Sequence, residues 1–331
     1  MNVVAIGGGT GLSTLLRGLK HHVTEPARPA RLRPVISRLA AIVTVTDEGG
    51  SSGRLRRDFR ILPPGDIRNC LVALAEDEQL LTQIFNYRFS SGHGLRGHNL
   101  GNLFLTALTH LTRDFAKAVR LSSEVLATRG EIFPATLSDV HLHATRTDGT
   151  VIRGERNITR TRVPIRRLHI VPSGCQPLPE ALAAIRKADL ITLGPGSLYT
   201  SLVPNLLVQG IAEAIARSRA VKVLICNLMT QPGESRGYSA ADHIRALHEH
   251  AGRRVFDHIV LNTKPLSPAL LERYAAERAA PVELDLDAVR KLGVKPLCAN
   301  LLMEDQVARH DPRRLTKLVL SLAKRPRARA R

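Results

Sequence analysis

The chain opens with Met1-Asn-Val-Val-Ala-Ile-Gly-Gly-Gly-Thr-Gly-Leu-Ser13, and this stretch decides the class of fold. The apolar run 3–6 is typical of a buried parallel strand, Gly7–Gly11 of a sharp turn, and 13–19 of an amphipathic helix. A strand, a glycine turn and a helix together present backbone N–H groups and the positive end of a helix to an anion. We expect a nucleotide or phosphorylated ligand at this turn; a tight turn without a ligand is the alternative.

The spacing of these glycines excludes two common nucleotide motifs. Gly7, Gly9 and Gly11 follow one another at every second position, whereas the dinucleotide fingerprint places its third glycine three residues after the second. A Walker A loop would need Gly-Lys-Ser/Thr, which does not follow Gly11. The turn therefore indicates a phosphate site of another kind.

Composition narrows the classes of protein that fit. Its 331 residues, 44% of them hydrophobic, suffice for one large α/β domain. A formal net charge of +19 favours anionic partners, but the charge is spread along the chain and accompanies no DNA- or RNA-binding motif. Aromatic residues make up only 3% of the chain and tryptophan is absent, which argues against stacking platforms for single-stranded nucleic acid. We regard nucleic acid as an unlikely partner and a solvated basic surface as the simpler explanation.

Cysteine usage and hydropathy favour a cytoplasmic protein. Four cysteines lie far apart in the sequence and form no C-x-x-C pair, which is typical of reduced thiols and of neither a disulfide framework nor a zinc site: Cys70, Cys175, Cys226 and Cys298. No apolar run approaches the length of a membrane span, and no signal peptide precedes the first strand. Self-association into a homo-oligomer is compatible with this sequence.

The pattern along the chain predicts a single domain, residues 1–320, with one insertion. Strand-like runs at 39–46, 188–193, 221–226 and 258–262 alternate with helical stretches, as in a parallel sheet with helical crossovers. Between 135 and 171 the residues alternate in polarity around Asp148-Gly149, which predicts a small antiparallel β unit. The last residues, 321–331, are predicted to form a basic, disordered tail.

Four of the predicted strands end in polar, glycine-rich loops: 7–13, 47–54, 194–200 and 227–234. The carboxyl ends of parallel strands share one edge of a sheet, so these loops should converge on a ligand. In the second loop, Asp47 can hold Mg²⁺ or a ribose hydroxyl, Ser51 and Ser52 can help form an anion nest, and Arg54 can grip a phosphate. The alternative is a capped helix start with a solvated acid.

Other polar segments are open to two interpretations. Asp66 and Asn69, after the stiff turn Pro63-Pro64-Gly65, either face the site or serve the start of a helix. The loop Gly194-Pro195-Gly196-Ser197 resembles a second phosphate loop in which Ser197 can cap the next helix. His93 and His98 have no third ligand at convincing spacing, so we expect no metal there. No catalytic residue stands out.

Taken together, six motifs resemble the gluconeogenesis factor (YvcK) family, within the superfamily of the 2-phospho-L-lactate transferase CofD. The resemblance covers roughly 3–320 and rests on GGGTGLS from Gly7, DEGGSSGRLR from Asp47, PPGDIRN from Pro63, GHNLGN from Gly97, GPGSLYTS from Gly194 and MTQPGE from Met229. It implies a Rossmann-like, three-layer α/β/α fold with a mostly parallel sheet. It also implies a cytoplasmic bacterial protein that binds a UDP-sugar such as UDP-N-acetylglucosamine and regulates cell shape and cell-wall synthesis during gluconeogenic growth.

The resemblance also carries residues over. The loops Gly8–Leu12 (Gly8, Gly9, Thr10, Gly11, Leu12) and Gly194–Tyr199 would hold the nucleotide, with Asn205 closing the second motif. Tyr274 and Arg309 match segments associated with UDP-sugar contact. On this reading the protein requires no cofactor, and its partners are the UDP-sugar and proteins of cell-wall synthesis.

Two alternatives stay open. One is an enzyme similar to the phospholactate transferase, using a GDP-linked donor and a deazaflavin acceptor, with Asp47 and Mg²⁺ neutralising the diphosphate. The family usually reads Asp-Asp-Gly-Gly where this chain has Glu48, and a longer side chain disturbs tight Mg²⁺ geometry, which weakens this alternative. The other is a nucleic-acid-binding protein that exploits the positive charge.

Overall fold

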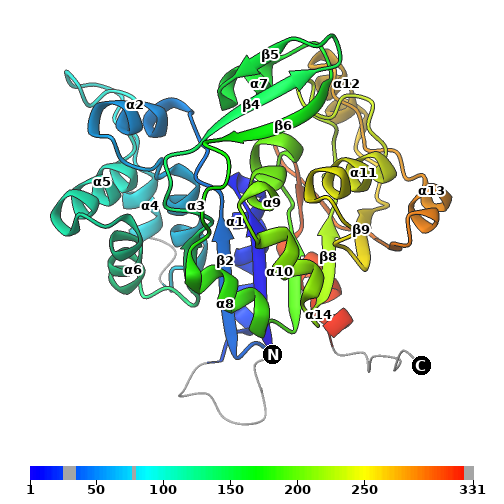
Figure 1. Cartoon of the computed structure of the whole chain (residues 1–331), viewed down its shortest axis with the longest axis horizontal. Helices are drawn as coiled ribbons and strands as arrows, with labels where there is room; N and C mark the ends of the chain where they lie inside the picture. Colours follow the sequence, from blue (N-terminus) through cyan, green and yellow to red (C-terminus); the bar gives the residue numbers. More distant parts are fainter. Residues whose placement is uncertain (25–34, 77–79, 324–331) are drawn as a thin grey trace.

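A computed structural model describes residues 1–24, 35–76 and 80–323. Its centre is a seven-stranded sheet in the order β10-β9-β8-β7-β1-β2-β3, in which every neighbouring pair of strands is parallel (Figure 1). The strands are β1 (Asn2–Gly7), β2 (Arg38–Val43), β3 (Glu131–Pro134), β7 (Leu190–Leu193), β8 (Val221–Ile225), β9 (His258–Asn262) and β10 (Lys295–Ala299). The predicted mostly parallel sheet is confirmed.

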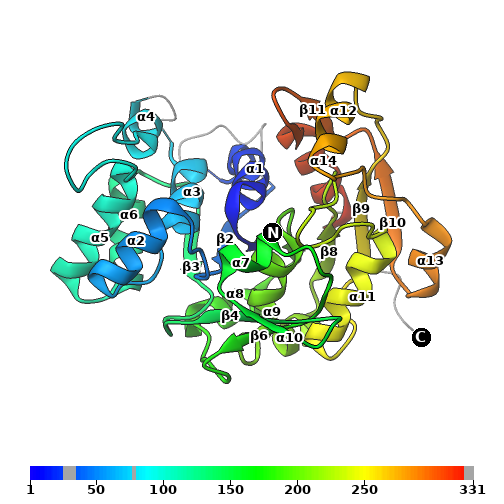
Figure 2. The ribbon, with the colours of Figure 1, turned by 90° about the horizontal axis from the view of Figure 1, so that it is seen from above.

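Helices cover both faces of this sheet, which makes the three-layer arrangement that the sequence predicts (Figure 2). On one face lie α1 (Gly9–Leu19), α3 (Gly65–Leu74) and α14 (Pro312–Ala323). On the other lie α8 (Pro179–Lys187), α9 (Val203–Leu207), α10 (Ile211–Arg217) and α11 (Ala240–Ala251). The central strands are apolar throughout because both of their faces are covered; in β1, Val3 to Ile6 are all buried.

The remaining helices gather at the two ends of the sheet. Beside β3 lie α2 (Gly50–Phe59), α4 (Leu80–Asn86), α5 (Leu100–Thr112) and α6 (Phe115–Val125). Near β9 and β10 lie α12 (Pro268–Ala276), α13 (Leu286–Lys291) and the hairpin β11 (Leu302–Glu304) and β12 (Ala308–His310). The hairpin and α12 share a small apolar core of their own with Met229, Leu266 and Leu270.

The insertion is a three-stranded antiparallel sheet, as expected from the alternation in that region. Its strands are β4 (His141–Arg146), β5 (Val151–Arg153) and β6 (Ile165–Val171), in the order β5-β4-β6, with the short helix α7 (Glu155–Arg160) between the last two in sequence. Figure 1 shows it above the carboxyl ends of the central strands. It therefore forms a roof over the edge of the sheet where a ligand is expected.

The C-terminal boundary of the domain differs from the expectation. Helix α14 continues to Ala323, and Leu322 is buried, so residues 321–323 belong to the domain and not to a tail. The rest of the predicted tail, 324–331, lies outside the described residues. All four cysteines are free, and three of them are buried. In the described part of the chain, no helix combines the length and apolar character needed to cross a membrane.

Candidate functional site

A cavity of about 590 Å³ opens at the carboxyl edge of the sheet, where the order of the strands reverses. From β1 the chain proceeds outward to β2 and β3, and it then returns to β7 on the other side of β1. Crevices at such switch points are the usual ligand sites of parallel α/β sheets. The loops that follow β1, β2, β7 and β8 all contribute to the cavity wall, so four loops distant in sequence meet there.

The first glycine loop packs very closely against its neighbours. Helix α1 begins at Gly9, directly after the extended Gly8. A Cβ atom on Gly8 would lie 2.6 Å from Oδ2 of Asp66, and one on Gly11 would lie 2.3 Å from the carbonyl oxygen of Pro195. Any side chain at Gly8 or Gly11 would clash with the neighbouring segments, so glycine is required at both positions. The N-terminus of α1 faces the cavity, where its backbone N–H groups can meet an anion.

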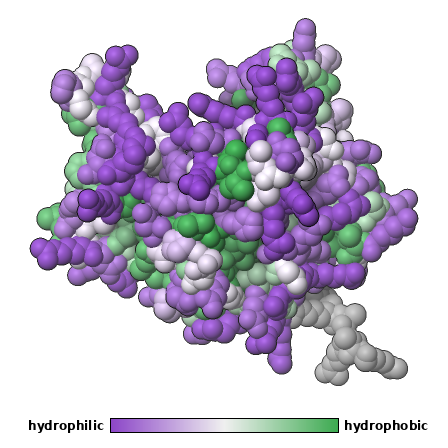
Figure 3. Space-filling view, turned by 45° about the horizontal axis from the view of Figure 1, so that its top comes forward, coloured by the Kyte–Doolittle hydropathy of each residue, from purple (hydrophilic) through white to green (hydrophobic). Residues whose placement is uncertain are grey.

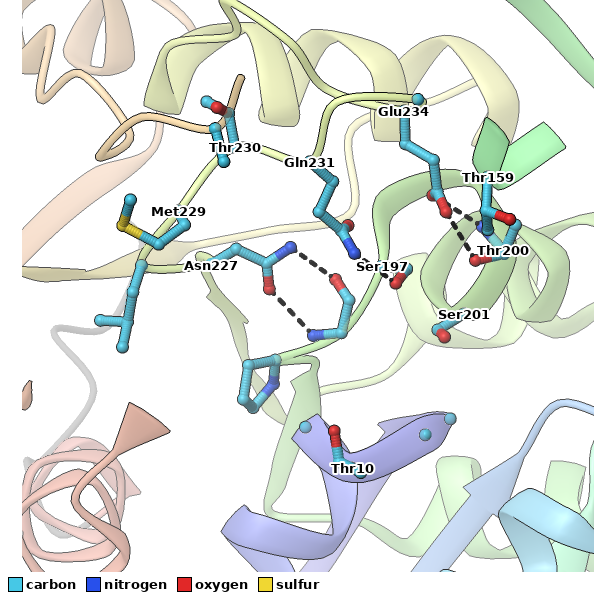
Figure 4. A pocket seen from close by; sticks show the side chains of 18 of the residues that line it. Thr10, Thr159, Ser197, Thr200, Ser201, Asn227, Met229, Thr230, Gln231 and Glu234 are labelled. Atoms are coloured by element: carbon cyan, nitrogen blue, oxygen red, sulfur yellow. Dashed lines mark hydrogen bonds between the residues drawn. The ribbon is translucent and has the colours of Figure 1, made fainter. Parts of the chain in front are cut away.

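The loop after β7 is held by the loop after β8 (Figure 4). The N–H of Gly196 donates to Oδ1 of Asn227 (3.1 Å), and Nδ2 of Asn227 donates to the carbonyl oxygen of Gly196 (2.8 Å). Nε2 of Gln231 donates to Oγ of Ser197 (2.7 Å). These three bonds fix the second glycine loop before any ligand arrives, which lowers the entropy cost of binding.

Glu234 fixes the segment that follows this loop. Its carboxylate accepts hydrogen bonds from the N–H groups of Tyr199 (2.7 Å) and Thr200 (3.1 Å) and from Oγ1 of Thr200 (2.8 Å) (Figure 4). Burial raises the pKa of Glu234, and these three donors oppose that shift. The segment Leu198–Leu202 is a single π-helical turn, a rare geometry that is frequent at functional sites.

Carboxylates are the majority of the charged side chains that line the cavity: Asp47, Asp66, Glu155, Glu234 and Glu277. Burial and the charge of Asp47 raise the pKa of Asp66 well above its ordinary value, and the same two causes raise the pKa of Glu155 to about 7. Among the described lining residues, Arg309 is the one Lys or Arg side chain. An anion entering this cavity must therefore be compensated by backbone N–H groups, by Arg309, and by protons or a cation on the carboxylates.

The fourth wall comes from the C-terminal part of the chain. Tyr274 lies on α12, and its hydroxyl accepts a hydrogen bond from the N–H of Ala308 (3.0 Å). Arg309, the next residue on β12, is exposed and forms no ion pair with any described residue. His310, also at the wall, is buried, and burial lowers its pKa to about 4. An aromatic ring and an unpaired guanidinium thus face the two glycine loops across the cavity.

The cavity brings together eleven of the residues expected at a ligand site. They are Gly8, Gly9, Thr10, Gly11, Asp47, Asp66, Pro195, Gly196, Ser197, Tyr274 and Arg309. Residues of six separate stretches of the sequence therefore line one cavity.

Three expected residues connect α2 to α5 and to the loop that precedes α5. Oγ of Ser51 lies 3.0 Å from Nδ1 of His98, and Oγ of Ser52 accepts a weak bond from Nδ2 of Asn102 (3.4 Å). Arg54 donates to the carbonyl oxygens of residues 94 and 96. None of the three lines the cavity. The side chains that the sequence suggested for binding phosphate therefore form hydrogen bonds within the protein instead.

The other expected residues lie behind the cavity wall. Leu12 is fully buried in the core, and Gly194 has φ +84° and precedes the cis peptide bond to Pro195. Tyr199 is buried with its hydroxyl 3.0 Å from that of Tyr238. The side chains of Asn69 and Asn205 form hydrogen bonds within the protein. Asn69 accepts one from Arg68 (2.7 Å), and Asn205 donates to the carbonyl oxygens of Gly7 (3.2 Å) and Ser201 (2.7 Å).

Glu155 and Thr159 of the insertion are lining residues that the sequence did not suggest. They lie on α7, whose position depends on a long-range contact: a Cβ on Gly233 would lie 2.0 Å from the carbonyl oxygen of Thr159. No local signal marks them. Asn227, Gln231 and Glu234 lie in a loop that the glycine pattern did single out.

Glu48 turns away from the cavity. Its Oε2 accepts a hydrogen bond from the N–H of Glu155 (3.0 Å), and its Oε1 lies 3.3 Å from Nδ1 of His141. The side chain therefore links the loop after β2 to the roof formed by the insertion. Its side chain is long enough to reach the start of α7. No cluster of three metal-ligating His, Cys, Asp or Glu side chains occurs in residues 1–24, 35–76 and 80–323.

Comparisons with known proteins agree with this architecture. Residues 3–302 match the family "2-phospho-L-lactate transferase CofD". A gluconeogenesis factor of Halalkalibacterium halodurans is 48% identical over 96% of this chain and 95% of its own length. One from Bacillus subtilis is 45% identical over 97% and 98%. The crystal structure of a UPF0052 family member from Bacillus halodurans superimposes with a TM-score of 0.90 at 47% identity, covering 96% of this chain and 98% of that one.

The matched length and identity leave no doubt about kinship. The fold and the site define a CofD-type α/β protein. Within that class, the chain belongs to the gluconeogenesis factor family.

Proposed function

We propose that the chain binds a UDP-sugar of the UDP-N-acetylglucosamine class and acts as a regulator of cell shape and cell-wall synthesis during gluconeogenic growth. The observation that carries the proposal is the convergence of two glycine loops with Tyr274 and Arg309 around one cavity. The loops offer backbone N–H groups to a diphosphate, and Arg309 offers a forked contact. The ring of Tyr274 offers a flat apolar surface to a base or sugar.

The size of the cavity suits such a ligand. A volume of about 590 Å³ falls within the range of typical ligand pockets, roughly 300–1,000 Å³. On this proposal the binding step needs no cofactor, the protein acts in the cytoplasm, and proteins of cell-wall synthesis are its partners.

A second candidate is a transferase that handles a nucleoside diphosphate-linked donor. The observation that favours it is the proximity of Asp47 and Asp66, since the negative charge of Asp47 contributes to the raised pKa of Asp66. Mg²⁺ in proteins is commonly held by one or two carboxylates together with substrate phosphates, and these two side chains fit that pattern. Such an ion would offset the negative charge of the diphosphate.

Calorimetry on the full chain tests the proposal. UDP-N-acetylglucosamine should bind and raise the melting temperature, whereas NAD should do neither. At about 100 times the dissociation constant, the ligand adds roughly 2.7 kcal/mol of stability. Arg309→Ala should weaken binding at least tenfold, and Arg313→Ala, an exposed arginine outside the cavity, should not. Equal stabilisation by NAD and by UDP-N-acetylglucosamine would contradict the proposal. Preferential binding of GDP with Mg²⁺ would support the transferase.

A further inference from the structure

A second cavity, of about 320 Å³, lies between the insertion and helix α11. Its lining residues are Thr145, Arg166, Arg167, His169, Glu249 and His250, and none of them lines the first cavity. Strand β6 is an edge strand of the insertion, and α11 runs beside it in both ribbon views. Figure 3 shows a face of the molecule that is mostly hydrophilic, with smaller hydrophobic areas between the hydrophilic ones.

A β-bulge brings two arginines to this hollow. Thr145 pairs with Arg167 and the next residue, Arg146, pairs with Ile165, so Arg166 has no partner on β4. Arg166 and Arg167 are consequently both exposed, although neighbours on a regular strand point to opposite faces. Neither forms an ion pair with any side chain in the described part of the chain. Two guanidinium groups that form no ion pair with a described residue thus line one small cavity, together with the carboxylate of Glu249.

His250 gives the hollow a fixed wall. Its Nδ1 donates to the carbonyl oxygen of Ala246 (2.6 Å), and its Nε2 accepts from the N–H of Leu168 on β6 (2.9 Å). The ring is therefore neutral and held in one orientation, and it joins β6 to the end of α11. A site whose walls are already bonded to one another loses little entropy when a ligand enters.

The charges in the cavity define what it can take. Arg166 and Arg167 suit phosphate, whose oxygens accept paired N–H donors from a guanidinium. Glu249 would repel a bare anion but accepts hydrogen bonds from hydroxyl groups. A ligand that carries both a phosphate and hydroxyl groups could bind the two arginines and Glu249 at the same time. The volume of the cavity is at the lower end of the range for small-molecule sites. We propose that this hollow is a second binding site, for a phosphorylated sugar or polyol.

The site is independent of the proposed function, because it uses a different cavity and different residues. Glucose 6-phosphate is a suitable probe, with inorganic phosphate and glucose as its two halves. Calorimetry on the full chain should give tighter binding of glucose 6-phosphate than of phosphate, and no detectable binding of glucose. Saturating UDP-N-acetylglucosamine should not displace the probe.

Two matched double variants locate the binding. Arg166→Ala with Arg167→Ala should weaken glucose 6-phosphate binding at least tenfold. Arg156→Ala with Arg162→Ala removes the same charge from exposed positions of the insertion outside the cavity and should leave the affinity unchanged. Glu249→Gln should reduce the preference for glucose 6-phosphate over phosphate.

Histidine side-chain NMR on the unmodified chain gives a local readout that does not depend on any variant folding. Glucose 6-phosphate should move the imidazole signals of His169, which lines the cavity, and leave those of the exposed His93 in place. Equal losses in the two double variants, displacement by UDP-N-acetylglucosamine, or unmoved His169 signals would each overturn the second site.

Discussion

Gly11 and Pro195 touch so closely that a single added methyl group would collide with the chain: a Cβ on Gly11 would lie 2.3 Å from the carbonyl oxygen of Pro195. Gly11 lies in the first turn of α1, which follows β1, and Pro195 lies in the loop after β7. Strands β1 and β7 are neighbours in the sheet. The two glycine loops are thus one structural unit. Damage to this contact should affect both at once.

Gly11→Ala should therefore destabilise the protein and weaken UDP-sugar binding. Overpacking of this kind typically costs about 1–3 kcal/mol. Chemical denaturation and calorimetry measure the two effects.

Gly196→Ala is the matched control within the same unit. Its Cβ would lie 3.2 Å from Leu202 and 3.3 Å from Ser201, contacts that small shifts of side chains relieve. We expect Gly196→Ala to have near-normal stability. The larger Gly196→Val should lose affinity for the UDP-sugar without unfolding, because its branched side chain keeps the ligand's phosphate from the backbone. Unchanged affinity in Gly196→Val would remove this loop from the site.

Glu234→Gln should loosen the loop that carries the second glycine motif. The carboxylate accepts from two backbone N–H groups and one hydroxyl, whereas an amide turns one of its two polar ends into a donor. A buried donor left unsatisfied costs about 1–3 kcal/mol. Glu277→Gln is the control, because Glu277 lines the cavity but is exposed. Equal stability of the two variants in urea would contradict the role given to Glu234.

Binding of a UDP-sugar without Mg²⁺ should tighten as the pH falls from 8 to 6. The pKa of Glu155 is raised to about 7 by burial and by Asp47, so the side chain takes up a proton in this range. Each proton removes a negative charge that opposes the diphosphate. Titration calorimetry at several pH values measures the trend, and Glu155→Gln should make it shallower. Affinity that rises with pH in the unmodified chain would refute the expectation.

His310 should make the protein less stable in acid. Its folded-state pKa is lowered to about 4 by burial, against an ordinary value of 6.5, so between these values the unfolded chain binds a proton that the folded chain does not. Stability is therefore complete above about pH 6.5 and falls with pH, by about 3 kcal/mol on reaching pH 4.

His310→Asn should reduce this slope in urea denaturation measured from pH 7 to 4. His93→Asn, at an exposed position, should leave the slope as it is. An identical slope in the unmodified chain and in His310→Asn would show that other groups cause the loss of stability in acid.

Local patterns in the sequence predict the fold class and the edge of the sheet at which the main cavity lies. An apolar run indicates a buried parallel strand, and the glycine-rich turn after it indicates where the strand ends. Both features depend only on residues that are close together in the sequence. Because parallel strands align their carboxyl ends, four such loops were enough to place a ligand site at one edge of the sheet. The loop residues Gly8–Gly11 and Pro195–Ser197 accordingly line the cavity.

Which polar side chains reach the cavity depends on tertiary packing. Ser51, Ser52 and Arg54 have the right chemistry for phosphate, but they bond to α5 and to the loop before it. Glu155 enters the cavity from an insertion more than a hundred residues beyond Asp47, and Glu48 spans the gap to hold α7 in place. A side chain's direction depends on the partners that packing brings to it, and those partners lie far away in the sequence. The residue types and the turns are local properties of the chain, whereas the contacts of each side chain depend on the whole fold.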